Sequence, residues 1–104
     1  MSKDSPEKPV HLIAHFTVND ADVYHQYEKG VFPILKSYGG RFITYDDQVT
    51  VLAGQRAQGR TVMIEFPLEE KLMVWWNSRE YVELAKLRKA STTTHSVFVV
   101  HTPL

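Results

Sequence analysis

Apolar and polar side chains alternate along three stretches of the chain, at residues 10–18, 41–45 and 60–66, and a fourth stretch at 95–101 is rich in valine. A period of two is typical of a β-strand that is buried on one side, and valine favours strands. The chain is therefore predicted to form four main strands.

Shorter features lie between the second and third of these stretches and just before the fourth. Asp46-Asp47 is predicted to form a tight turn, and residues 48–52 a short returning strand that completes a small hairpin. Residues 53–59 and 91–94 are polar, and both segments are predicted to be loops.

A first helix is predicted from apolar residues that recur at steps of three or four between residues 23 and 38. Asn19 or Asp20 can cap its amino-terminal end. Gly30 and Pro33 lie inside the helix, and proline lacks the N–H that an α-helix needs and crowds the preceding turn. We therefore expect a kink or a short break near Gly30.

A second helical segment extends from Leu68 to about Ala90, and the polar pair Asn77-Ser78 divides it. The Ser78 hydroxyl can accept a hydrogen bond from the first turn of the later piece. Two consecutive helices, rather than one long helix, are expected here.

The stretch Tyr38-Gly39-Gly40-Arg41-Phe42 joins the first helix to the second strand. Many helices end with a glycine in the left-handed conformation, and Gly39 follows the last apolar residue of the helix. Valine is strongly disfavoured at positive φ, so a valine at either glycine with that conformation should cost well over about 1 kcal/mol of stability.

The order strand, helix, strand, strand, helix, strand is the ferredoxin-like βαββαβ plan, an α+β sandwich, here with a small extra hairpin strand. We expect a flexible amino-terminal arm at residues 1–9 and a single domain at residues 10–104. Two helical segments can cover only one face of the sheet, so the other face is left with several large apolar side chains. The predicted solution is a homodimer in which two sheets pack face to face as an α/β barrel.

Composition narrows the function classes. The 104 residues include 12 basic and 12 acidic side chains, so no net charge attracts nucleic acid or anionic lipid. The chain has no cysteine, which excludes a disulfide, a thiolate nucleophile and cysteine metal ligands. No stretch reads as a membrane span or signal peptide, and no dinucleotide or phosphate-loop motif is present. We expect a cytoplasmic protein with no cofactor and no nucleic-acid or membrane partner.

Three motifs in order are similar to those of a known family: Tyr38-Gly39-Gly40-Arg41-Phe42, the Val-Met-Ile-Glu-Phe-Pro run at 62–67, and Trp-Trp-Asn-Ser-Arg-Glu-Tyr at 75–81. Together with the mid-helix proline, they resemble the domain-of-unknown-function family numbered thirteen-thirty. That family belongs to the dimeric α/β-barrel superfamily, alongside antibiotic-biosynthesis monooxygenases and muconolactone isomerases. The resemblance implies a ferredoxin-like subunit and a barrel-like dimer, and no established activity.

His15 and Glu65 lie on the mixed faces of two strands that are neighbours in this fold. A carboxylate beside a histidine can hold it in one tautomer as a general base, so these two are the candidate catalytic residues. The alternative is a polar cross-strand pair at a wet interface. Relatives often carry arginine at the position of His15, so the resemblance does not extend to a fixed positive charge there.

Four residues are candidates for ligand binding on their own chemistry. Arg41 can bind a carboxylate or phosphate through its planar guanidinium, or it can pair with Glu65 and tie two strands together. Ser78 and Tyr81 can face one pocket mouth; alternatively Ser78 only caps a helix and Tyr81 only packs in the core. Arg88 shares the face of Tyr81 and can reach the same pocket, although a cation also suits the carboxyl end of a helix.

Trp75 and Trp76 are adjacent, so on a helix they diverge by about 100° and cannot face the same core. One should pack on the sheet, and the other should line a pocket, meet a partner or stay exposed; Trp75 is included among the ligand-binding candidates. The five histidines show no spacing typical of a metal site. A cross-strand pair of His15 with His95 is the weakest hypothesis, and no metal site is predicted.

Two function classes remain. The first is an enzyme without a cofactor, or a binding protein, for a small aromatic or carboxylate metabolite, with Arg41, Glu65, His15 and Tyr81 as the polar groups of a hydrophobic pocket. The second is a non-catalytic dimeric module whose polar residues serve assembly. A cavity above about 300 Å³ that holds those side chains would favour the first class, and a packed interior the second.

Overall fold

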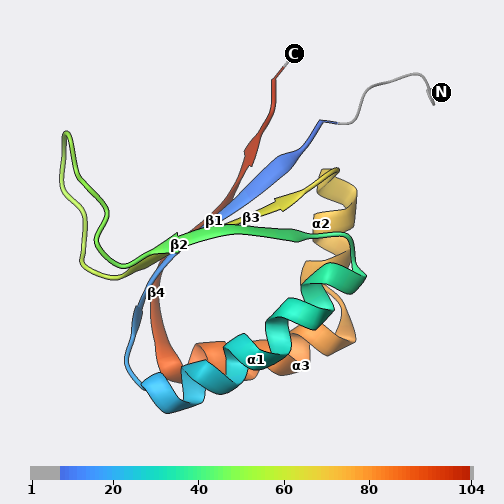
Figure 1. The fold of residues 1–104 in the computed structure, drawn as a ribbon, viewed down its shortest axis with the longest axis horizontal. Coiled ribbons are helices and arrows are strands. Elements are labelled where there is room, and N and C mark those ends of the chain that lie inside the picture. The colour runs from blue at the N-terminus through green and yellow to red at the C-terminus, as the bar shows by residue number, and fades with distance from the viewer. Residues whose placement is uncertain (1–7, 104) are drawn as a thin grey trace.

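The computed structural model describes residues 8–103, and its helices and strands follow the predicted order (Figure 1). The elements are β1 (Val10–Val18), α1 (Ala21–Ser37), β2 (Arg41–Asp46), β3 (Arg60–Phe66), α2 (Glu69–Trp76), α3 (Arg79–Ser91) and β4 (Thr92–His101). Most of the arm predicted at residues 1–9 lies outside the described residues. Pro9 is tied to the other end of the chain, because its carbonyl accepts a 2.6 Å hydrogen bond from the Thr102 hydroxyl.

The four strands form one antiparallel sheet in the order β2-β3-β1-β4, which confirms the ferredoxin-like plan. β1 is central, with Val10 opposite Phe66 of β3 on one side and His101 of β4 on the other. All three helices lie on one side of the sheet, as Figure 1 shows, and α1 packs beside α3. The sheet therefore has one covered face and one open face.

The hydrophobic core lies between the covered face and the helices. Alternate residues of β1 and β3 point into it, as their period of two predicts, and α1 adds one residue per turn. The core residues of these three elements are Val10, Leu12, Ala14, Phe16, Ile64 and Phe66 from the strands, and Tyr24, Tyr27, Val31 and Leu35 from the helix.

Helix α1 begins where the sequence predicts, since the Asp20 carboxylate accepts a 3.1 Å hydrogen bond from the Val23 amide. Of the kink or short break expected near Gly30, the break does not occur, because one continuous helix passes through both Gly30 and Pro33. A Cβ at Gly30 would lie 2.8 Å from Cδ1 of Leu84 on α3. The glycine thus allows α1 and α3 to approach closely rather than interrupting the helix.

The short returning strand predicted at residues 48–52 does not form. Residues 47–59 instead make one long loop that extends from the ends of β2 and β3 (Figure 1). The Gln48 amide donates to the Asp46 side chain over 2.8 Å, so the chain turns away before a new strand can pair with β2. Two apolar residues of this run stay exposed to solvent, Val51 at 48% and Leu52 at 94%.

The loop predicted at residues 91–94 is also wrong. Ser91 is the last residue of α3, and residues 92–94 already belong to β4, where they pair with residues 16–18 of β1. Threonine is β-branched and favours a strand when a partner edge is available, and β1 offers that edge.

Gly39 and Gly40 prove necessary for two different reasons. Gly39 has a φ of 91°, in the left-handed region predicted for the end of the helix. Gly40 does not have a positive φ, but a Cβ there would lie 2.5 Å from Cδ1 of Leu35 and 2.6 Å from Cζ of Phe66. Sheet and helix layer therefore touch at Gly40 with no room for a side chain.

Asparagine at each glycine separates these two reasons. Asparagine tolerates the left-handed region, so Gly39→Asn should cost about 1 kcal/mol of unfolding free energy or less. Gly40→Asn forces a side chain between two buried residues and should cost about 2 kcal/mol or more. Urea denaturation of both variants measures the difference, and equal losses at the two positions would contradict the close contact at Gly40.

Candidate functional site

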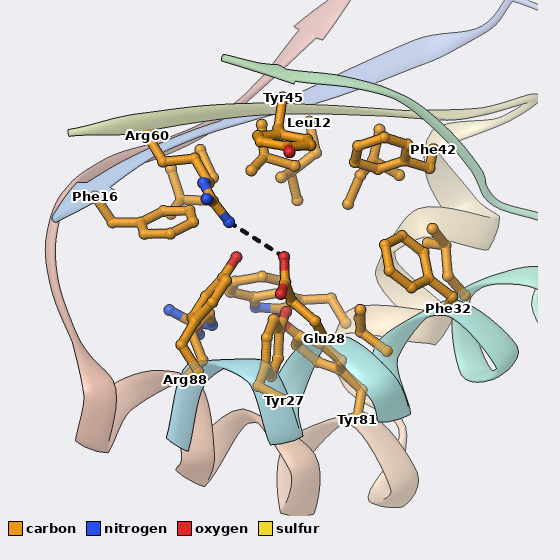
Figure 2. Close-up of a pocket in the computed structure, with 18 of the residues that line it drawn as sticks. Leu12, Phe16, Tyr27, Glu28, Phe32, Phe42, Tyr45, Arg60, Tyr81 and Arg88 are labelled. Carbon is orange, nitrogen blue, oxygen red and sulfur yellow. Dashed lines mark hydrogen bonds and ion pairs between the residues drawn. The ribbon is translucent and has the colours of Figure 1, made fainter. Parts of the chain in front are cut away.

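A cavity of about 130 Å³ lies between the covered face of the sheet and the three helices. Figure 2 shows side chains of both layers pointing toward it, with Phe42 and Tyr45 on the sheet side and Phe32 and Tyr27 on the helix side. The lining residues are mostly aromatic and aliphatic: Leu12, Ala14, Phe16, Tyr24, Tyr27, Glu28, Val31, Phe32, Leu35, Phe42, Tyr45, Arg60, Val62, Ile64, Trp75, Trp76, Tyr81, Arg88 and Val97.

Two buried tyrosines supply hydroxyl groups to the wall. The hydroxyl oxygens of Tyr27 and Tyr81 lie 2.9 Å apart, so one donates a hydrogen bond to the other. Burial raises the pKa of Tyr27 well above its ordinary value, and burial together with the Glu28 charge raises the pKa of Tyr24 to about 12. The phenols of Tyr24 and Tyr27 therefore stay protonated near neutral pH and can donate hydrogen bonds, but they cannot serve as bases.

Arg60 connects the two layers at one side of the cavity. Its guanidinium lies 3.1 Å from Glu28 of α1, the contact drawn as a dashed line in Figure 2. Two further hydrogen bonds of 2.8 and 3.1 Å join it to Asp47, and these are the main reason why the pKa of Arg60 is raised. The guanidinium also lies over the Tyr45 ring, 4.5 Å from its centre. The charge of Arg60 is thus balanced by two carboxylates of the protein itself.

Two N–H groups of the wall are buried and lack a hydrogen-bond partner among residues 8–103. They are Nε1 of Trp75, a side chain that is 1% exposed, and Nε of Arg88. Leaving a buried donor unpaired costs about 1–3 kcal/mol, so such groups are uncommon and need an explanation. Both belong to residues that line the cavity.

Three of the predicted ligand-binding residues meet in this cavity: Trp75, Tyr81 and Arg88. The rings of Trp75 and Tyr81 pack with their centres 4.2 Å apart. Ser78 does not line the cavity; its hydroxyl accepts a 3.1 Å hydrogen bond from the Tyr81 amide and caps α3. Ser78 therefore acts as a helix cap, which was the alternative to a position at the pocket mouth.

Arg41 and Glu65 lie on the open face of the sheet, away from the cavity. Arg41 donates two hydrogen bonds to one oxygen of Glu65, at 2.6 and 3.2 Å. This is the alternative in which Arg41 pairs with Glu65 and ties two strands together. The other oxygen of Glu65 lies 3.0 Å from His11. Arg41, and to a lesser degree His11, holds the pKa of the Glu65 carboxyl below its usual range.

His15 is not brought together with Glu65, because the register of β1 and β3 places His11 opposite Glu65 and His15 opposite Thr61. His15 is buried, its Nε2 donates to the Ala57 carbonyl over 3.0 Å, and burial lowers its pKa. The two predicted catalytic residues, His15 and Glu65, therefore do not lie opposite each other in this subunit.

The rings of His15 and His95 do lie close together, with centres 4.6 Å apart. Across residues 8–103, however, no group of three or more histidine, aspartate or glutamate side chains is placed to hold a metal ion. In the same part of the chain, no helix is both long enough and apolar enough to cross a membrane.

The sequence reasoning missed the polar residues that matter most on the other side of the cavity, Arg60, Glu28 and Tyr24. A signal was present for each. Arg60 starts a strand at the same parity as Val62 and Ile64, so alternation places it on the covered face. Glu28 lies four residues after Tyr24 on α1, which puts the two on one side of the helix.

The sequence of the chain matches one family model, described as "Domain of unknown function (DUF1330)", over residues 9–102. The chain belongs to the DUF1330 family. This confirms the resemblance found in the sequence motifs. No match to this DUF1330 protein was found among proteins of curated function.

Solved structures with the same fold come from several bacteria. RPA0582, a protein of unknown function from Rhodopseudomonas palustris, has a TM-score of 0.73 to the DUF1330 protein at 17% identity, covering 97% of this chain and 86% of its own. SnoaB, a cofactor-independent oxygenase from Streptomyces nogalater, has a TM-score of 0.65 at 13% identity, covering 93% and 95%. A dimeric ferredoxin-like protein of unknown function from Thermobifida fusca has a TM-score of 0.58 at 12% identity, covering 94% and 92%. At these identities the likeness shows the fold alone.

Proposed function

We propose that this protein binds a small aromatic metabolite in the cavity between sheet and helices, without a cofactor. The observation that carries this proposal is the lining itself, which combines aromatic rings from both layers with a few hydrogen-bond donors. Binding sites for small molecules have this composition. The fold is shared with a cofactor-independent oxygenase, which supports a ligand that is handled by protein side chains alone.

The size of the cavity limits the ligand. Its volume of about 130 Å³ is below the 300 Å³ or so of a typical drug-sized site. An engineered apolar cavity of about 150 Å³ accommodates benzene, so this cavity suits a single ring rather than a fused polycyclic molecule. We propose binding rather than catalysis, because Glu28 is the one carboxylate among the lining residues and is already paired with Arg60.

The second candidate is a non-catalytic dimeric module. It is favoured by the open face, where Glu65 is hydrogen-bonded to both Arg41 and His11, so these polar residues tie strands together and none of them lines the cavity. Such a module would have no use for buried unpaired donors in an aromatic cavity. The two candidates therefore make opposite predictions for ligand binding.

Fluorescence titration with single-ring compounds tests the cavity directly, because both tryptophans of the chain line it. Phenol, benzamide and benzoate should each change the emission of Trp75 and Trp76 in a saturable way. Ala14→Leu places an isobutyl group in the cavity and should weaken binding by about tenfold or more, because the ring and the new side chain compete for one space.

Ala90→Leu is the matched control, since Ala90 is exposed on α3. This variant should bind like the wild type, and both variants should keep a cooperative thermal transition. Failure of every compound to bind, or equal binding by the wild type and Ala14→Leu, would contradict the proposed function.

We further propose that two copies associate through their open sheet faces. Ile13 of β1 lies opposite Met63 of β3 and Phe98 of β4, so these three side chains share the face that no helix covers. Phe98 and the nearby Val100 are 49% and 45% exposed in the single subunit. A contiguous apolar patch of this kind usually marks an interface, and the neighbour from Thermobifida fusca is described as dimeric.

A lysine within the patch tests the assembly. Sedimentation velocity should show the wild type as a dimer at micromolar concentration and Phe98→Lys as a folded monomer, because a buried unpaired charge is costly. Val82→Lys is the control: Val82 is 51% exposed on α3, on the helix side, and its replacement should leave the dimer intact. A monomeric wild type, or a dimer lost only with Val82→Lys, would contradict this interface.

A further inference from the structure

Arg88 differs from the other arginine of the cavity in lacking a carboxylate partner. It lies on the buried side of α3, three residues after Ala85 and seven after Tyr81, both of which are core residues. No ion pair joins it to an acidic side chain in the part of the chain that the structure describes. Its Nε is buried without a partner.

The surroundings of Arg88 are aromatic. Its guanidinium carbon lies 5.7 Å from the centre of the Trp76 ring. Burial raises the pKa of Tyr27, and the charge of Arg88 acts in the opposite direction on that pKa. Trp75, whose own N–H is unpaired, packs against Trp76 and Tyr81. Arg88, Trp75 and the Tyr27–Tyr81 pair thus belong to one cluster at the helix side of the cavity, visible in part in Figure 2.

The electrostatic balance of the cavity is incomplete at this cluster. Two arginines and one glutamate line the cavity, and Glu28 is bound to Arg60, which Asp47 also neutralises. Arg88 is left as a cation beside an apolar space, where its attraction for an anion is stronger than in water. A guanidinium with free N–H groups is the preferred partner of a carboxylate.

On the basis of the proposed function, we infer that the ligand is a small aromatic carboxylic acid and that the helix-side cluster binds its carboxylate. The ring occupies the cavity, one carboxylate oxygen accepts from Arg88, and the indole N–H of Trp75 is a second donor. The alternative is that Arg88 has only a structural role. Its guanidinium lies over the Trp76 ring, and a cation is favourable near the carboxyl end of α3.

Benzoate and benzamide separate these explanations, because they have nearly the same shape and differ in charge. Isothermal titration of the wild type at neutral pH should show benzoate binding about tenfold more tightly than benzamide or better. Arg88→Met keeps an unbranched apolar side chain on Trp76 and removes the charge. It should lose this preference and bind both compounds with the affinity of benzamide.

Arg79→Met is the matched control, since Arg79 lies on the same helix and is exposed. It should retain the full preference for benzoate, and thermal melts should show all three proteins folded. Equal affinity of the wild type for the two compounds would overturn this inference and leave the proposed function standing. A preference that survives in Arg88→Met would overturn the role of Arg88. Binding of neither compound would overturn the proposed function and this inference together.

Discussion

The contact between the two layers at Gly40 is the constraint on which the rest of the structure depends. There the end of α1 and the end of β3 meet through Leu35 and Phe66, with no room for even one additional carbon. Farther along the sheet, the rings of Phe16, Tyr24 and Tyr27 separate the layers. A sandwich that is closed at one end and held apart by rigid rings at the other cannot fill its whole interior, and the cavity follows from that geometry.

Electrostatics then distinguish the two sides of the cavity. Arg60 is held by Glu28 and Asp47 and by the Tyr45 ring, so it connects the sheet, α1 and the long loop. Arg88 on the opposite layer has an aromatic neighbour and makes no ion pair with an acidic side chain among residues 8–103. The same residue type therefore has a structural role at one position, and at the other it is the residue that we propose binds the ligand.

The fold could be predicted from the sequence because periodicity is a local signal. β1 and β3 were predicted with their observed bounds, and the capping residues Asp20 and Ser78 were among those named. The strand predicted at residues 48–52 was wrong, because alternation of apolar and polar residues does not show whether a strand has a surface to pack on. The break predicted near Gly30 was wrong, and nothing in the local pattern indicated the close contact between Gly30 and Leu84, a residue more than fifty positions away.

The site was predicted in part for the same reason. Tyr81 and Arg88 are seven residues apart, so helical spacing placed them on one face of α3, and both line the cavity with Trp75 of α2. His15 and Glu65 were paired because they lie on the mixed faces of two neighbouring strands, which does not fix the register, and the observed partner of Glu65 is His11. Arg60 and Glu28 come from different layers, and no local pattern reports a distance of 3.1 Å between them.

A crystal structure of the protein grown with benzoate tests the central claim most directly. The account predicts the benzoate ring between the sheet and the helices, with a carboxylate oxygen within about 3 Å of a guanidinium nitrogen of Arg88. A benzoate bound on the open face beside Arg41, or a ring in the cavity with its carboxylate directed at Arg60, would contradict it.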